Sequence, residues 1–185
     1  MGDNELREPA YDVAAGMLAP FFAIAFGLAW GILALYIFVT DWAAATFGPI
    51  SGTHPLFMLA VYAPAIAAIG LVVKQGGGRG LRRFMGRLLL WRTSWPWVLF
   101  LLLGIPVVFL AGALWKGNLD TAPFLTEPAP VLLAALVFML VLGPIEELGW
   151  RGFALPLLQR RMAPFWAGLV LGLIWALWHL PAFFL

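Results

Sequence analysis

The segment Val13–Thr40 reads VAAGMLAPFFAIAFGLAWGILALYIFVT and contains no charged residue. It is longer than the ~20 residues that a helix needs to cross the hydrocarbon core of a bilayer. Inside lipid every backbone N–H and C=O must be bonded internally, so only helices and closed barrels can span the membrane. Barrel strands show alternating segments of about ten residues, and this run does not alternate. The segment therefore predicts a transmembrane helix.

The composition of the whole chain agrees with a lipid environment. Apolar residues make up 63% of the 185 residues and charged residues 11%, against about 45–50% and about 25% in soluble domains. Such a chain has too little polar surface to face water on all sides. The absence of cysteine excludes disulfides, thiolate metal sites and cysteine nucleophiles. The expected fold class is all-α, a polytopic transmembrane helix bundle.

Further apolar stretches give about five spans in total. They are residues 55–73, 95–114, 130–159 and 164–185, in addition to the first. The acidic segment 1–12 does not resemble the positive start of a signal peptide, so the first span is expected to be permanent. We predict a single membrane-embedded helical domain over residues 1–185. Because the last run is apolar through Leu185, the natural protein is expected to continue beyond it.

A basic segment separates the second and third predicted spans. Six of the eleven Lys and Arg residues lie within residues 74–92. Apolar and basic positions alternate there at helical spacing, which is typical of an amphipathic helix on the membrane surface; a solvated basic loop is the alternative. The positive-inside rule places this segment, and with it the N-terminus, in the cytoplasm. We expect a multi-pass protein in the plasma membrane of a bacterium. Anionic lipid, and not nucleic acid, is the expected partner of the basic cluster.

Three charged residues lie inside the fourth predicted span, in the sequence GPIEELGWRG of residues 143–152. An ionisable group at mid-membrane costs about 3 kcal/mol on insertion scales, and such groups usually mark a functional path. Glu147 and Arg151 are four residues apart, with the acid nearer the N-terminus, which favours an ion pair. Glu146 points about 100° away on the helix and is expected to find no partner within its own helix. Pro144 predicts a kink beside it.

His179 on the fifth predicted span is the expected partner of Glu146. Both lie ~21–22 Å from the turn that joins the two spans, at ~1.5 Å per residue, so an antiparallel hairpin brings them to the same depth. We expect the two side chains to share a polar cavity. The alternative is a polar cluster that only holds helices together. His54, beside Pro55 at the outer boundary, is interpreted as a surface residue.

The sequences EELGWR (146–151) and WALWH (175–179) resemble the CPBP intramembrane protease family, which includes type II CAAX prenyl endopeptidases and bacterial relatives linked to bacteriocin processing and self-immunity. The family motif Glu-Glu-x-x-x-Arg falls on Glu146, Glu147 and Arg151. The motif Phe-x-x-x-His falls on His179, with Trp175 in place of the phenylalanine. A second histidine and an asparagine that the family carries on later helices have no counterpart in this chain.

The resemblance implies an intramembrane endopeptidase that hydrolyses a peptide bond of a membrane-associated protein or peptide. Glu146 would act as the general base and His179 would position the same water, while Glu147 and Arg151 would orient the helix. Alternatively, Glu146 and His179 would bind zinc or another divalent metal, which activates water, although two ligands are too few for the usual catalytic zinc. A non-catalytic immunity or scaffold protein is the competing function. A transporter is disfavoured because the chain shows no duplicated halves.

Overall fold

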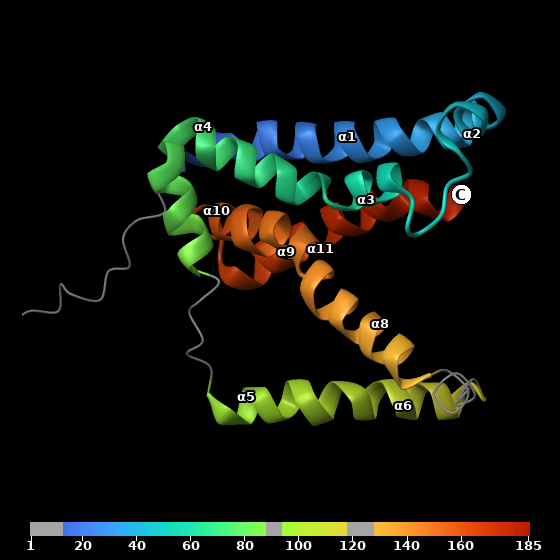
Figure 1. Cartoon of the computed structure of the whole chain (residues 1–185). Coiled ribbons are helices and arrows are strands. Elements are labelled where there is room, and N and C mark those ends of the chain that lie inside the picture. Colours follow the sequence, from blue (N-terminus) through green and yellow to red (C-terminus); the bar gives the residue numbers. More distant parts are fainter. Residues whose placement is uncertain (1–12, 88–93, 118–127) are drawn as a thin grey trace, which may run out of the picture. The chain divides into compact units, whose positions relative to one another are not determined.

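A computed structural model describes residues 13–87, 94–117 and 128–185, and no β-strand occurs among them (Figure 1). After a 3₁₀ turn at Ala15–Met17, the helices are α1 (Leu18–Phe38), α2 (Thr40–Phe47), α3 (Pro55–Val61), α4 (Ala63–Gly86), α5 (Trp95–Leu99), α6 (Ile105–Trp115), α8 (Ala129–Leu142), α9 (Ile145–Gly149), α10 (Leu155–Gln159) and α11 (Pro164–His179). The predicted all-α fold class is confirmed.

Four helical segments are long and apolar enough to cross a membrane: Ala15–Phe38, Trp95–Trp115, Ala129–Gln159 and Pro164–Phe184. A fifth results if α3 and α4 form one span, although they meet at an angle of 60°. The predicted span over residues 55–73 is thus divided between two helices. Pro64 has no N–H to donate to the carbonyl of Ala60, and α3 accordingly ends at Val61. The structure thus supports an integral membrane protein with about five spans.

Two π-helical segments interrupt the regular helices. Phe100–Gly104 lies between α5 and α6, and Trp150–Ala154 lies between α9 and α10. Each is followed, after one residue, by a proline, Pro106 or Pro156. Because proline removes an i→i−4 hydrogen bond, the wider turn accommodates the missing donor. Single π turns inside α-helices are frequent at functional sites, and the second of these adjoins the charged motif.

The basic segment is helical as far as the structure describes it. Gly77 breaks α4 with φ 57° and ψ −153°, a conformation that glycine adopts without a Cβ penalty. Beyond this break, Phe84 is buried and Leu81 half-buried, whereas four arginines are exposed: Arg79, Arg82, Arg83 and Arg87. An amphipathic helix, and not a solvated loop, is therefore confirmed as far as Gly86. Residues 88–92 of the basic segment lie outside the described residues. Its place on the membrane surface stays a prediction.

The chain divides into two compact units. The first contains α1, α2, α3, nearly all of α4 and the segment from Leu142 onward; the second comprises residues 86–141. In the second unit, α5, the π turn after it and α6 include no buried side chain, so their apolar surface suits contact with lipid. All the candidate site residues lie in the first unit. The prediction of one domain over residues 1–185 stays a prediction.

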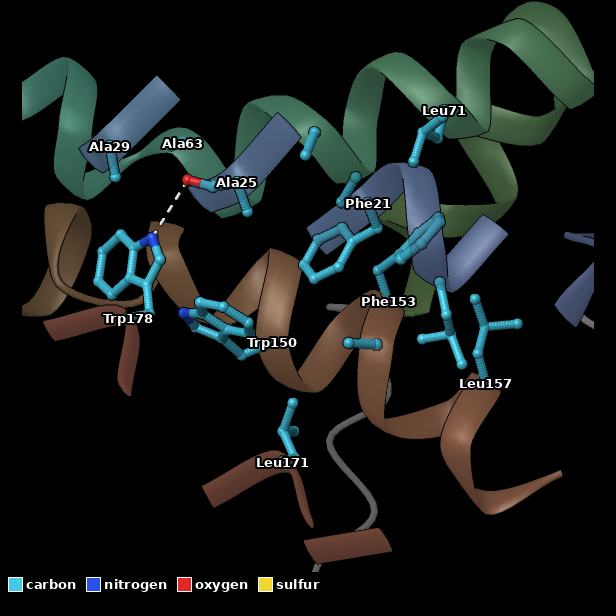
Figure 2. Packing of buried hydrophobic residues seen from close by; sticks show 14 of the residues in the cluster. Phe21, Ala25, Ala29, Ala63, Leu71, Trp150, Phe153, Leu157, Leu171 and Trp178 are labelled. Carbon is cyan, nitrogen blue, oxygen red and sulfur yellow. Dashed lines mark hydrogen bonds between the residues drawn. The ribbon is translucent and has the colours of Figure 1, made fainter. Parts of the chain in front are cut away.

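Aromatic side chains form the core of the first unit (Figure 2). Phe21 of α1 stacks on Phe153, with ring centroids 5.1 Å apart, and meets the edge of Trp150 at 5.6 Å. Trp178 of α11 donates its indole N–H to the carbonyl oxygen of Ala25 on α1 at 3.2 Å. Aromatic pairs of this kind contribute about 0.5–1.5 kcal/mol beyond burial. The core therefore fixes α1, the π turn at Trp150 and α11 against one another.

His54 is a capping residue. Its Nδ1 accepts a hydrogen bond from the backbone N–H of Leu56 at 3.2 Å, and its Nε2 lies 2.8 Å from the carbonyl oxygen of Phe47. Since a carbonyl only accepts, Nε2 carries the proton. The half-buried imidazole thus joins the end of α2 to the start of α3. His54 therefore has a local structural role, and its place at the outer boundary stays a prediction.

Candidate active site

A new helix, α9, begins just before the two glutamates of the motif. Helix α8 ends at Leu142, and Gly143 and Pro144 form a turn before α9 begins at Ile145. The N–H of Glu147 donates to the carbonyl oxygen of Pro144 at 3.1 Å and closes the first turn of α9. The helix is interrupted at Gly143 and Pro144, since proline has no N–H with which to continue the ladder. The kink predicted at Pro144 stays a prediction.

The chain then returns through a short turn into α11. The N–H groups of Arg161 and Met162 both donate to the carbonyl oxygen of Leu158 and finish the preceding helix. Pro164 begins α11, where its fixed φ is favourable and its missing N–H is not needed. The guanidinium of Arg160 donates to the carbonyl oxygen of Val13 at 2.7 Å. The predicted hairpin of the fourth and fifth spans is therefore tied to the start of the first.

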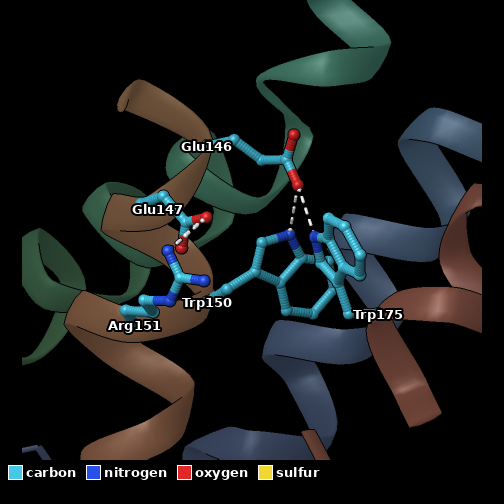
Figure 3. A network of polar contacts seen from close by, with 5 residues as sticks. All are labelled: Glu146, Glu147, Trp150, Arg151 and Trp175. Carbon is cyan, nitrogen blue, oxygen red and sulfur yellow. Dashed lines mark hydrogen bonds and ion pairs between the residues drawn. The ribbon is translucent and has the colours of Figure 1, made fainter. Parts of the chain in front are cut away.

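Glu147 and Arg151 form the predicted ion pair. Arg151 Nη1 lies 2.9 Å from Glu147 Oε1 (Figure 3). The exposed fraction is 33% for the side chain of Glu147 and 72% for that of Arg151, so the pair lies on the outside of the first unit. Such a pair contributes little when it faces water. In lipid, its benefit is that neither charge enters the bilayer uncompensated.

Glu146 is bound by two tryptophans. Its Oε1 accepts hydrogen bonds from the indole Nε1–H of Trp150 at 2.9 Å and from that of Trp175 at 2.8 Å (Figure 3). The expectation that Glu146 has no partner within its own helix is therefore wrong. The side chain of Trp150, four residues along the helix, is long enough for its indole N–H to reach the carboxylate, and this N–H can only donate. The second partner is Trp175 of α11, in place of the predicted His179.

His179 lies one helical turn beyond Trp175. Its Nδ1 is 2.9 Å from the backbone carbonyl oxygen of Trp175, and the two rings pack edge to face with centroids 4.3 Å apart. Since the carbonyl only accepts, Nδ1 carries a proton, which leaves Nε2 as the ring nitrogen that can accept a hydrogen bond. Trp178 contacts the same imidazole, with ring centroids 4.7 Å apart. The imidazole thus has a defined tautomer and a defined plane.

The predicted direct contact between Glu146 and His179 is not found among the described residues; instead, Trp175 binds both side chains and so links them. Glu146, Glu147 and His179 are all half-buried, and within the described ranges no charged side chain is fully buried. The acids therefore lie at the surface of the first unit and not in its interior. Trp175 is 41% exposed and completes this surface beside them.

The described residues do not by themselves complete a metal centre. No group of three or more His, Cys, Asp or Glu side chains converges among residues 13–87, 94–117 and 128–185. Catalytic zinc normally takes three protein ligands and a water. Glu146 and His179 supply two candidate ligands, so the donor set in hand does not fit the usual site.

The two indole donors are the part of the site that the sequence interpretation missed. The motif assigns Trp175 only an aromatic role in a phenylalanine position, and the sequence interpretation gives Trp150 no role. The available signal was their spacing: Trp150 lies four residues after Glu146, and Trp175 lies four before His179. A tryptophan one turn from an intramembrane carboxylate is a candidate hydrogen-bond donor.

Comparison with known proteins agrees with the motifs. Residues 128–185 match the sequence model described as type II CAAX prenyl endopeptidase Rce1-like. The chain is also 34% identical, over 149 residues, to CAAX prenyl protease 2 of Methanococcus maripaludis; the match covers 72% of this chain and 52% of that protein. The chain therefore spans about half the length of the curated relative. No solved structure matches it. These similarities confirm the resemblance to the CAAX protease-like family, and the matched residues 128–185 contain Glu146, Glu147, Arg151 and His179.

Proposed function

We propose that the full-length protein is an intramembrane endopeptidase that hydrolyses a peptide bond of a membrane-associated protein or peptide. The observation that carries this proposal is that one residue of α11, Trp175, binds both Glu146 of α9 and His179. The named relative, a CAAX prenyl protease, supports the reaction class.

Glu146 and His179 would act on the same water molecule in two different roles. The hydrogen bonds to Glu146 Oε1 leave Oε2 as the atom that takes a proton from the water. His179 Nε2, with its lone pair, accepts the second hydrogen bond of the same water and orients it. The resulting hydroxide adds to the peptide carbonyl, the C–N bond breaks, and Glu146 returns its proton to the leaving amine. General base catalysis of this kind contributes about 10²–10⁴-fold.

Glu147 and Arg151 would support this chemistry without touching the water. Their ion pair spans one turn of the motif helix, on a different face from Glu146. It compensates both charges and so allows the helix to keep its depth in lipid. We therefore propose an orienting role for this pair, and a catalytic role for Glu146 and His179 alone.

The test of the proposal is cleavage by the full-length protein in liposomes that contain a membrane-anchored peptide. His179→Gln is expected to lower product formation by at least about tenfold, because an amide does not orient the water as imidazole does. A non-catalytic scaffold, in which the polar residues only hold helices together, predicts that the biological function survives the same change. Unaltered turnover of a validated substrate by His179→Gln would contradict the endopeptidase assignment.

Removal of divalent metals is expected to leave cleavage within about twofold of the untreated rate, because water and side chains alone carry the proton transfers described above. The measurement is product formation after dialysis against a chelator. A loss of activity that added zinc restores would contradict this expectation and would favour metal binding by Glu146 and His179 with ligands outside the described residues.

We also propose an orientation in the membrane. The exposed arginines of α4 suit the cytoplasmic side, which would place the N-terminus of the chain on that side as well. Anionic lipid headgroups would be their partners. The plasma membrane of a bacterium stays a prediction from the sequence.

A further inference from the structure

We infer that Trp175 is a positioning residue that holds both reacting groups of the proposed site at once: its indole N–H fixes the carboxylate of Glu146, and its backbone carbonyl fixes the imidazole of His179. The catalytic part of this inference rests on the proposed function. The two contacts themselves, at 2.8 Å and 2.9 Å, do not depend on that function.

The carboxylate of Glu146 receives both of its indole donors on the same oxygen. Figure 3 shows the two N–H groups converging on Oε1 while the second oxygen points away from both rings. An sp² oxygen has two lone pairs, so two donors occupy Oε1. Oε2 is then the oxygen with capacity for a water molecule. The donors select which oxygen acts and prevent rotation of the carboxylate.

The two donors differ in how they are themselves held. Trp150 is 1% exposed and is fixed in the core against Phe21 and Trp178. Trp175 is 41% exposed and comes from α11. Its hydrogen bond therefore crosses from one arm of the hairpin to the other. Loss of the Trp150 donor would also disturb the core, whereas loss of the Trp175 donor removes mainly the link between the two helices.

The imidazole of His179 depends on the same residue. The carbonyl oxygen of Trp175 accepts from Nδ1, and the indole ring lies against the imidazole edge to face. In a functional histidine, the hydrogen bond made by one ring nitrogen determines the role of the other nitrogen. Any shift of α11 relative to α9 would therefore displace Nε2 and Oε2 in relation to each other. Trp175 couples the two positions.

The indole is needed for this coupling, and not merely an aromatic ring. Phenylalanine, which the motif carries at this position, keeps a ring beside His179 and the same backbone carbonyl. It has no N–H, so Glu146 Oε1 would keep one donor, that of Trp150. The hydrogen bond across the hairpin is thus a particular feature of this sequence.

The test compares Trp175→Phe with Trp30→Phe in the full-length protein. Trp30 is the matched control, because its indole N–H also ties α1 to α11, but it donates to the carbonyl oxygen of Trp178, at 3.0 Å, and not to a side chain of the proposed site. Trp175→Phe is expected to lower kcat about tenfold, in line with loss of a hydrogen bond to a charged group, with KM within twofold. Trp30→Phe is expected to lower the unfolding temperature and to leave kcat within twofold. Equal kcat in wild type and Trp175→Phe would overturn the positioning role.

A stability cycle tests the contact independently of activity. Unfolding by denaturant is measured for Trp175→Phe in the wild-type background and in the background of Glu146→Ala, which lacks the acceptor. The expected result is a loss of stability in the first background and none in the second. Equal losses in both would show that no coupling exists and would overturn the inference. If the stabilities of Trp175 and Glu146 are coupled but the protein cleaves no substrate, the hydrogen bond is real and the proposed function is wrong. Trp175 would then have a structural role only.

Discussion

Replacing Glu146 with glutamine is expected to lower the rate of peptide cleavage by about 10²–10⁴-fold, the usual contribution of a general base. The amide oxygen of glutamine still accepts the indole N–H groups of Trp150 and Trp175, so the local packing has no reason to change. What is lost is the ability to take a proton from water. The variant therefore separates chemistry from folding.

The measurement is product formation from a membrane-anchored peptide, together with the unfolding temperature of the same preparation. Asp41→Asn is the matched control, since it makes the same acid-to-amide change at an exposed position in the first turn of α2. We expect the control to cleave at the wild-type rate. Cleavage by Glu146→Gln at a rate similar to that of the control would refute the assignment of Glu146 as the base.

Replacing Gly149 with alanine is expected to give the largest loss of stability of any single methyl addition in the first unit. A Cβ built on Gly149 would lie 2.4 Å from the backbone carbonyl carbon of Pro64 and 2.5 Å from its oxygen. These are backbone atoms, so no side-chain rotation relieves the clash. Gly149 and Pro64 are both buried where α9 meets α4. Small residues allow such close contact between membrane helices.

The expected penalty of Gly149→Ala is about 1–3 kcal/mol or more, as for other overpacked cores. It is measured as a shift in thermal unfolding in detergent. Gly168→Ala in α11 is the control, because a Cβ there meets no atom within 4 Å; alanine there also has the better helix propensity. An unfolding temperature for Gly149→Ala equal to that of the control would mean that α9 and α4 are not in the close contact described.

The spans could be predicted because lipid imposes a simple rule on the sequence. The uncharged run of α1 and the apolar run of α11 are visible without a structure. The ion pair of Glu147 and Arg151 also follows from spacing within one helix. Rules of this kind involve residues that are near one another in the sequence, so the sequence pattern alone is enough to predict their geometry.

Contacts between distant segments were harder to predict. The bend between α3 and α4 depends on which carbonyl Pro64 leaves without a donor and on how the neighbouring helices pack. The contact of Gly149 with Pro64 joins residues far apart in the chain, and no periodicity reveals it. The hydrogen bond of Trp175 to Glu146 was hidden for a different reason: tryptophan counts as apolar in a hydropathy pattern although its N–H is a donor.

The functional prediction depended on a motif of few residues, and the comparisons match it where those residues lie. The family model covers residues 128–185, which contain both glutamates, Arg151 and His179. Depth matching predicted His179 as the partner of Glu146, whereas the residue of α11 that binds Glu146 is Trp175, one turn before His179. The roles of these residues in cleavage rest on the proposed function.

The most direct test of the central claim, that Glu146 and His179 act on one water molecule, is the cleavage rate of the double variant Glu146→Gln/His179→Gln in the full-length protein. Residues that act as a unit have strongly non-additive effects. We therefore predict that the double variant is no slower than the slower single variant. A rate reduced by the product of the two single losses would show that the side chains act independently, and the account would be contradicted.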